Sequence, residues 1–378
     1  MVEDEVHQKF SVSLDPLCRL TVLRSCERNS ISEIIVTFHH SICDALSIMN
    51  FIERLLSYCQ QIEGGEHIEV ITMKALPPLE ELLISSSIAK KGLISKLKQA
   101  SWLFQLVGPF KKAKLIIERQ AYQSERHTHF LPTSLNKEVL INLKKRCKEE
   151  KTTVHGALCA AMLFGAAKTA HADMPIHLSC GSTISLRKYC EPEVTEDYMA
   201  CIADGTGHTY TLKKDTYFWD LARESKSRIS HSIQNGEMFM NFSNSGKSNQ
   251  SESMKKQWET RMGRFFTVMI ANVGQMTFSG QYGKFQLKEI YGVQAVHNIG
   301  PCFGLNVVTL CEQMFCGFNY VTPLVSTKTA KFFVDYFVNT IHTACMPQSS
   351  TLSFFDETEK ASVYQLEKTA GSGKDVGI

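Results

Sequence analysis

The chain has 378 residues, a length that suits two packed domains better than one. Hydrophobic residues make up 43% and charged residues 21%, which is typical of a globular protein and excludes a disordered or collagen-like chain. The formal net charge of +3 is too small to indicate a nucleic-acid-binding surface.

The first predicted elements surround a pair of histidines. Residues 17–23 have the pattern of a strand, and residues 34–38 form a short β-branched run that is typical of a buried strand. His39 and His40 follow this run directly, and from near Asp44 onward apolar residues recur at helical spacing. The pair therefore lies at a strand-to-helix junction, where the backbone is held on both sides while side chains can project into a cleft.

The next segment, residues 84–119, is basic and partly amphipathic, with aromatic residues such as Trp102 and Phe110 among its lysines. It could lie on a membrane surface and make peripheral membrane contact. It could also be a connecting helix with a solvated lysine face, which we favour because runs of charge usually mark solvated faces.

The remaining chain alternates between helices and strands. We predict helices capped by Ser134 or Asn136, by Thr152 or Thr153, and by Ser326, and a further one beginning near Phe218. Strands are predicted at residues 177–186, 266–272, 285–291, 305–311 and 314–321, the last two joined as a hairpin through Glu312 and Gln313. Residues 243–256 are predicted to be a surface loop and residues 369–378 a disordered tail. The alternation predicts an α/β fold, with domains at residues 1–125 and 126–378.

The 13 cysteines are scattered, and many lie in apolar runs. Their odd number and the lack of paired spacing predict reduced, mostly buried thiols and no metal site. The first ten residues lack the apolar core of a signal peptide, and no uncharged run reaches the roughly 20 residues of a membrane-spanning helix. We therefore expect a cytoplasmic protein without a transmembrane segment.

The segment from His39 to Asp44, HHSICD, resembles the HHxxxDG motif of the condensation-domain and chloramphenicol-acetyltransferase-like acyltransferase superfamily. The likeness is closer to its stand-alone members of the alcohol acetyltransferase and phthiocerol dimycocerosyl transferase type. It continues through DPLCRLTVLR, TTVHGALCAAMLFGAA, STISLRKY, FWDLARESK, ANVGQM, QYGKFQLKEIYGV and FCGFNYVTPLVS. The resemblance implies a two-domain pseudo-dimer of chloramphenicol-acetyltransferase-like sandwiches with a tunnel between the halves.

The resemblance also implies a catalytic role for His40. As general base, its ring would take a proton from an alcohol or amine while that acceptor attacks a thioester carbonyl. No bound cofactor or metal is implied: acyl-CoA is the co-substrate, or an acyl carrier protein delivers the donor in trans. His39 is implied to support the site.

Further residues match the family by position. The motif aspartate, Asp44, is implied to point away from substrate and to pair with an arginine, which Arg187 in STISLRKY matches. Asn272 and Gly274 in ANVG match a segment that lines the family's tunnel.

Each assignment has a plainer alternative. Asp44 could be only a helix N-cap, or it could cap and pair at once. Arg187 could be a surface arginine, and Asn272 and Gly274 could form a turn without substrate contact. Ala45 replaces the family's glycine, which would cost roughly 1 kcal/mol if that position required positive φ. Only 38 residues precede the histidine pair, so we expect a shortened first half.

Three functions follow from these residues. The leading one is a free-standing, CoA-dependent acyltransferase of the O-acyl type that acts on small-molecule donors and acceptors. The second is carrier-dependent, amide-forming condensation. The third is a catalytically inactive relative that serves as a binding or scaffold protein.

Overall fold

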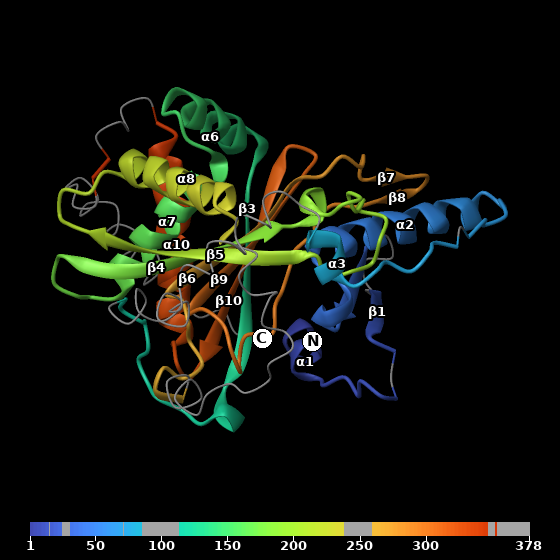
Figure 1. Cartoon of the computed structure of the whole chain (residues 1–378), viewed down its shortest axis with the longest axis horizontal. Coiled ribbons are helices and arrows are strands. Elements are labelled where there is room, and N and C mark those ends of the chain that lie inside the picture. The colour runs from blue at the N-terminus through green and yellow to red at the C-terminus, as the bar shows by residue number, and fades with distance from the viewer. Residues whose placement is uncertain are drawn as a thin grey trace, which may run out of the picture.

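The structure is a computed structural model that describes residues 1–14, 16–24, 31–70, 72–84, 113–237, 259–346 and 352–353. A larger part is built on a six-stranded sheet, and a smaller part with a two-stranded sheet and one long helix lies beside it (Figure 1). Most of the segment 84–119, the whole predicted loop 243–256 and the whole predicted tail 369–378 lie outside the described residues.

The large sheet has the strand order β3-β10-β9-β6-β4-β5. β6 runs parallel to both β4 and β9, and the other neighbours are antiparallel. The mixed sheet confirms the predicted α/β class. Its strands are β3 (His127–Leu135), β4 (Ile176–Ser185), β5 (Ala203–Leu212), β6 (Val268–Gln275), β9 (Phe303–Leu310) and β10 (Gln313–Thr322).

Helices α6 (Lys137–Glu149), α7 (Val154–Thr169), α8 (Phe218–Gln234) and α10 (Thr327–Ala344) share one hydrophobic core with this sheet (Figure 1). All four were predicted, and three begin where a polar side chain accepts a backbone N–H. Those caps are Asn136, Thr153 and Ser326. Of the two alternative caps, Ser134 lies in β3, and the Thr152 hydroxyl donates instead to the Ala222 carbonyl.

The smaller part carries the histidine pair. It contains α1 (Val2–His7), the antiparallel strands β1 (Cys18–Arg24) and β2 (Ser32–Phe38), the 3-10 turn η1 (His40–Ile42), α2 (Ala45–Glu63) and α3 (Leu79–Ile84). The predicted strands and helix are confirmed, but β2 is not buried as expected: it belongs to a two-stranded sheet, and its residues are exposed or half-buried. The domain boundary at residues 125 and 126 stays a prediction.

Helix α2 lies on the face of the large sheet opposite the four helices. Its Met49 is buried against Val308 and Phe315, whose strand neighbours Val307 and Met314 face the helical core. Because side chains alternate across a strand, the sheet lies between the two layers. The helix that follows the histidines therefore packs against the large sheet through a second hydrophobic cluster, separate from the helical core.

The predicted strand at residues 285–291 is wrong beyond its first two residues. Only β7 (Gln281–Tyr282) and β8 (Phe285–Gln286) pair, and the chain then crosses the face of the large sheet. Ile290 packs in the cluster with Met49, and a Cβ atom at Gly317 would lie 2.3 Å from the Gly292 carbonyl oxygen. A segment that lies on a sheet face this closely cannot also be one of its strands.

The hairpin between β9 and β10 turns one residue earlier than predicted. Its central residues are Cys311 and Glu312, with φ angles of 47° and 61°, and Gln313 already pairs with Leu310. Positive φ at both central residues is typical of a type I′ turn, which matches the twist of the flanking strands.

Five regular elements were not predicted, namely α1, α3, β3, β5 and β7. Two short 3-10 turns, η3 (Gln123–Glu125) and η4 (Arg187–Tyr189), complete the described elements. Within the described ranges, no helix combines the length and the hydrophobicity needed to cross a membrane.

Candidate active site

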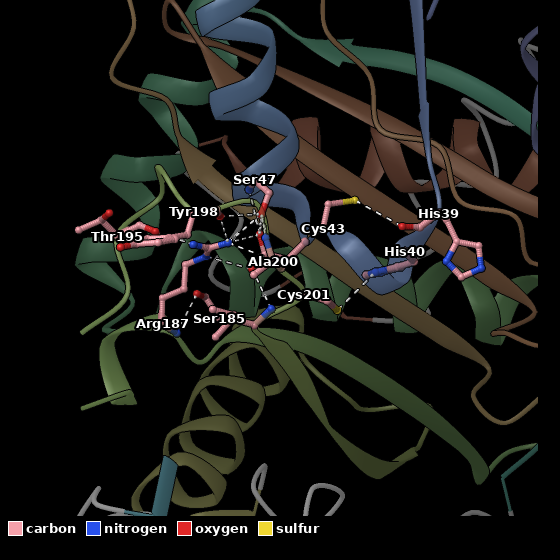
Figure 2. Close-up of polar contacts among 12 residues, drawn as sticks. His39, His40, Cys43, Ser47, Ser185, Arg187, Thr195, Tyr198, Ala200 and Cys201 are labelled. Atoms are coloured by element: carbon pink, nitrogen blue, oxygen red, sulfur yellow. Dashed lines mark hydrogen bonds and ion pairs between the residues drawn. The ribbon is translucent and has the colours of Figure 1, made fainter. Parts of the chain in front are cut away.

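The two histidines of the motif face different surroundings. β2 ends at Phe38, and the His39 N–H donates to the Leu17 carbonyl over 2.9 Å. The His39 ring turns toward its own turn, with Nδ1 2.7 Å from the Ser41 hydroxyl oxygen, and it points away from Cys201 (Figure 2). His39 is therefore held by local contacts.

The His40 ring lies beside a residue that is distant in the sequence. Its Nδ1 is 3.6 Å from Sγ of Cys201, a residue just before β5 (Figure 2). His40 itself is exposed. The contact with Cys201 is the side-chain hydrogen bond of the His40 ring within the described residues, and it is made at Nδ1.

The surroundings of His40 favour its protonated form. The Cys201 sulfur accepts a hydrogen bond from the charged ring and raises the pKa of His40 to about 9, against the opposing effect of partial burial. The main chains of His40 and Cys43 act in the same direction as Cys201. Burial raises the pKa of the Cys43 thiol to about 12, so Cys43 stays neutral at physiological pH.

Asp44 caps helix α2 from a buried position. Its Oδ1 accepts hydrogen bonds from the Ser47 N–H and the Ser47 hydroxyl, each over 2.9 Å. Its Oδ2 accepts the N–H of Ile202 over 3.2 Å, which joins the helix to the start of β5. Only 3% of Asp44 is exposed, so its charge needs a partner inside the protein.

Arg187 is that partner. Its Nε donates to Oδ2 of Asp44 and its Nη2 to Oδ1, both over 3.0 Å, which is a bidentate ion pair. Both side chains are 4% exposed, so the alternative of a surface arginine is wrong. Capping by Asp44 and pairing with Arg187 occur together.

The same guanidinium holds the chain that leads into β5. Nη1 donates to the Thr195 carbonyl over 2.6 Å, and Nη2 lies 3.1 Å from the carbonyls of Tyr198 and Ala200 (Figure 2). The Asp44 N–H also donates to Ala200 over 3.1 Å. Cys201 is therefore fixed between Ala200 and Ile202, which are both anchored. The sequence alone did not indicate Cys201, because it lies 161 residues from His40 and outside every motif.

Asn272 and Gly274 form a local bulge in β6. The Asn272 Oδ1 accepts the Gly274 N–H over 3.0 Å, Gly274 has a φ of 90°, and the pairing with β9 shifts register between them. Val273 packs in the cluster that holds α2. The bulge thus lies where the two parts meet, and its contact with substrate stays a prediction.

Ala45 is the first residue of α2 and is exposed. It is not among the residues with positive φ. Alanine in place of the motif glycine therefore carries no backbone strain at this position.

The described residues contain no group of three or more His, Cys, Asp or Glu side chains that could hold a metal ion. Their cysteines are all free thiols.

Comparisons with known proteins agree with this geometry. The sequence matches the alcohol acetyltransferase family over residues 4–341. No curated protein sequence matches the chain.

Three solved structures share this fold with the chain. A trichothecene 15-O-acetyltransferase from Fusarium sporotrichioides has a TM-score of 0.67 at 11% identity, covering 88% of this chain and 70% of that one. The epimerization domain from the third module of tyrocidine synthetase B has a TM-score of 0.61 at 13% identity, covering 91% of this chain and 75% of that one. Polyketide synthase associated protein 5 from Mycobacterium tuberculosis has a TM-score of 0.61 at 12% identity, covering 88% of this chain and 76% of that one. Identities this low show the fold alone, which is the predicted two-lobed one.

Proposed function

We propose that this chain, which belongs to the alcohol acetyltransferase family, transfers an acyl group from acyl-CoA to the hydroxyl of an alcohol, with His40 as general base. The family assigns acyl transfer to the chain. Donor, acceptor and base are the proposal. One observation carries the assignment of the base: His40 is exposed, and the Cys201 sulfur contacts its Nδ1.

In the proposed reaction, neutral His40 accepts the hydroxyl proton at Nε2 while the hydroxyl oxygen attacks the thioester carbonyl carbon. A tetrahedral intermediate forms and collapses as the carbon–sulfur bond breaks. The imidazolium returns its proton to the departing CoA sulfur, so ester and free thiol are the products. The base contributes about 10²- to 10⁴-fold to the rate, and the positioning of the two substrates supplies much of the remainder.

Asp44 and Arg187 support this reaction without touching substrate. Their buried pair fixes the first turn of α2, which follows His40 after four residues, and it fixes the chain on either side of Cys201. The chain that carries His40 and the chain that carries Cys201 are thereby held by the same buried ion pair.

The test is a panel of acyl-CoA donors of increasing chain length, each offered with primary alcohols, phenols and amines. Release of free CoA thiol is followed spectroscopically, and the acylated product is identified by mass spectrometry. We expect acceptor-dependent thiol release and an ester product. Hydrolysis alone, at the same rate with and without acceptor, would contradict the proposal.

A second candidate is amide formation from a carrier-bound donor, since the structural neighbours include condensation domains. A phosphopantetheinyl carrier loaded with the same acyl group, compared with acyl-CoA at equal concentration, separates the two. Binding without catalysis is the third candidate, because another neighbour is an X-domain in complex with OxyB from teicoplanin biosynthesis. Absence of turnover with every donor would favour it.

A further inference from the structure

We propose that Cys201 is a positioning residue of the catalytic base: its sulfur holds Nδ1 of His40 and so leaves Nε2 as the nitrogen that accepts the substrate proton. This inference rests on the proposed function. It concerns a residue that no motif of the sequence singles out.

The contact joins two segments that the fold fixes independently. His40 opens the turn η1 after the strand β2, and Cys201 stands between Ala200 and Ile202. The Ala200 N–H donates to the Ser47 hydroxyl over 3.2 Å and the Ile202 N–H to Asp44 over 3.2 Å. With both neighbours anchored to the first turn of α2, the Cys201 sulfur keeps a defined place 3.6 Å from the ring.

The chemical consequence is a choice of tautomer. A neutral imidazole carries one proton, and the nitrogen without it is the base. In the proposed arrangement Nδ1–H donates to the Cys201 sulfur, which leaves the free lone pair on Nε2. A His40 without this partner can also place its proton on Nε2 or rotate, and either change removes the base from the substrate.

Cys201 has the largest effect on the pKa of the His40 ring. Burial opposes this effect, and the main chains of His40 and Cys43 add smaller contributions in the same direction as Cys201. Removing the sulfur therefore removes the largest favourable interaction of the charged ring.

The test compares the wild-type protein with Cys201→Ala and Cys201→Ser. Cys59→Ala is the matched control, because Cys59 is also a half-buried free thiol but lies on α2. The first readout is NMR of protein with ¹⁵N-labelled histidine, with the His40 signals assigned by their loss in His40→Ala. The second is the pH profile of kcat/KM with the donor and acceptor found active.

In Cys201→Ala, we expect the His40 titration midpoint to fall from about 9 toward 6.5 and the neutral ring to lose its preference for the Nδ1–H tautomer. The alkaline plateau of kcat/KM should fall by between about 10-fold and about 100-fold. Cys201→Ser should recover part of the plateau because its hydroxyl can still accept from Nδ1–H. Cys59→Ala should match the wild type in both readouts.

An unchanged His40 midpoint and tautomer in Cys201→Ala would overturn the inference, whatever the activity. A changed midpoint in a protein whose activity does not depend on His40 would instead overturn the proposed function. The NMR readout thus separates the two failures.

Discussion

The carboxylate of Asp44 and the guanidinium of Arg187 meet through two hydrogen bonds of 3.0 Å between the cap of α2 and the turn after β4. The pair is buried and joins the part of the chain that carries the histidines to the part that carries the large sheet. Removing either charge would destabilise the fold, because the other charge would stay buried without a partner.

Replacing Asp44 with Asn tests that cost. The variant keeps the side-chain shape and the capping oxygen, but Arg187 stays buried without a counter-charge. We expect a loss of about 3–5 kcal/mol in the free energy of unfolding, measured by urea denaturation, together with a lower yield of folded protein.

The matched control is Asp197→Asn. Asp197 also pairs with an arginine, Arg54 of α2, but the two side chains are 50% and 42% exposed. An exposed pair contributes about 0–1 kcal/mol, so this variant should unfold close to the wild-type midpoint. Equal stability losses for the two variants would argue against a special role for the buried pair.

Arg187→Lys separates charge from geometry. Lysine keeps the positive charge, but its single ammonium group cannot replace the bidentate contact to Asp44 and also reach the carbonyls of Thr195 and Ala200. We expect a loss of about 2 kcal/mol or more in unfolding free energy, because buried acceptors lose their donors. A wild-type denaturation curve for this variant would show that charge alone suffices.

Much of the fold could be predicted from local patterns. The helices α2, α6, α7 and α10 have polar caps followed by apolar residues, and these signals depend on neighbouring residues only. The missed strands β3 and β5 lie at the two edges of the sheet, where burial on one side is weak. β3 carries Pro132, which an edge strand tolerates, and β5 carries glycines and His208 where an apolar alternation would be expected.

The site divides in the same way. His40, Asp44 and Arg187 could be named because they stand in segments that resemble a family, and the structure brings Asp44 and Arg187 together. The crossing of residues 287–296 over the sheet and the approach of Cys201 to His40 depend on tertiary contacts between distant segments. No local pattern records such contacts.

The crossing segment makes a sharp prediction at Gly317. A Cβ atom there would lie 2.3 Å from the Gly292 carbonyl oxygen and 2.8 Å from the Phe130 ring. Gly317→Ala should therefore destabilise the protein by about 1–3 kcal/mol or more through overpacking.

The control for this prediction is Gly304→Ala on the neighbouring strand β9. A Cβ atom at Gly304 meets nothing closer than 3.6 Å, so the unfolding free energy should change by less than about 1 kcal/mol. Equal thermal shifts in the two variants would show that the segment does not lie against Gly317.

Ala45 allows a test of the motif itself. Ala45 is exposed at the first position of α2 and does not have a positive φ, so the backbone there does not need the conformational freedom of the motif glycine. Ala45→Gly should cost less than about 1 kcal/mol of helix stability and should leave kcat/KM within about twofold. A large gain in activity would show that alanine impairs the site.

The pH dependence of the wild-type enzyme follows from the Cys201 contact. The base must be neutral, and the contact raises the pKa of His40 to about 9, so the active fraction grows as the pH rises through that value. Below the midpoint, kcat/KM should rise about tenfold per pH unit. A profile already level at the ordinary histidine value of 6.5 would contradict this assignment.

The role of His40 is tested most directly by kcat/KM for acceptor-dependent thiol release in wild type, His40→Ala and His40→Gln, with the exposed His67→Ala as control. Each variant is first shown to unfold at the wild-type temperature. Loss of the base should reduce kcat/KM by about 10²- to 10⁴-fold in both His40 variants and leave His67→Ala unchanged. Equal rates in wild type and His40→Ala would contradict the proposal that His40 is the catalytic base.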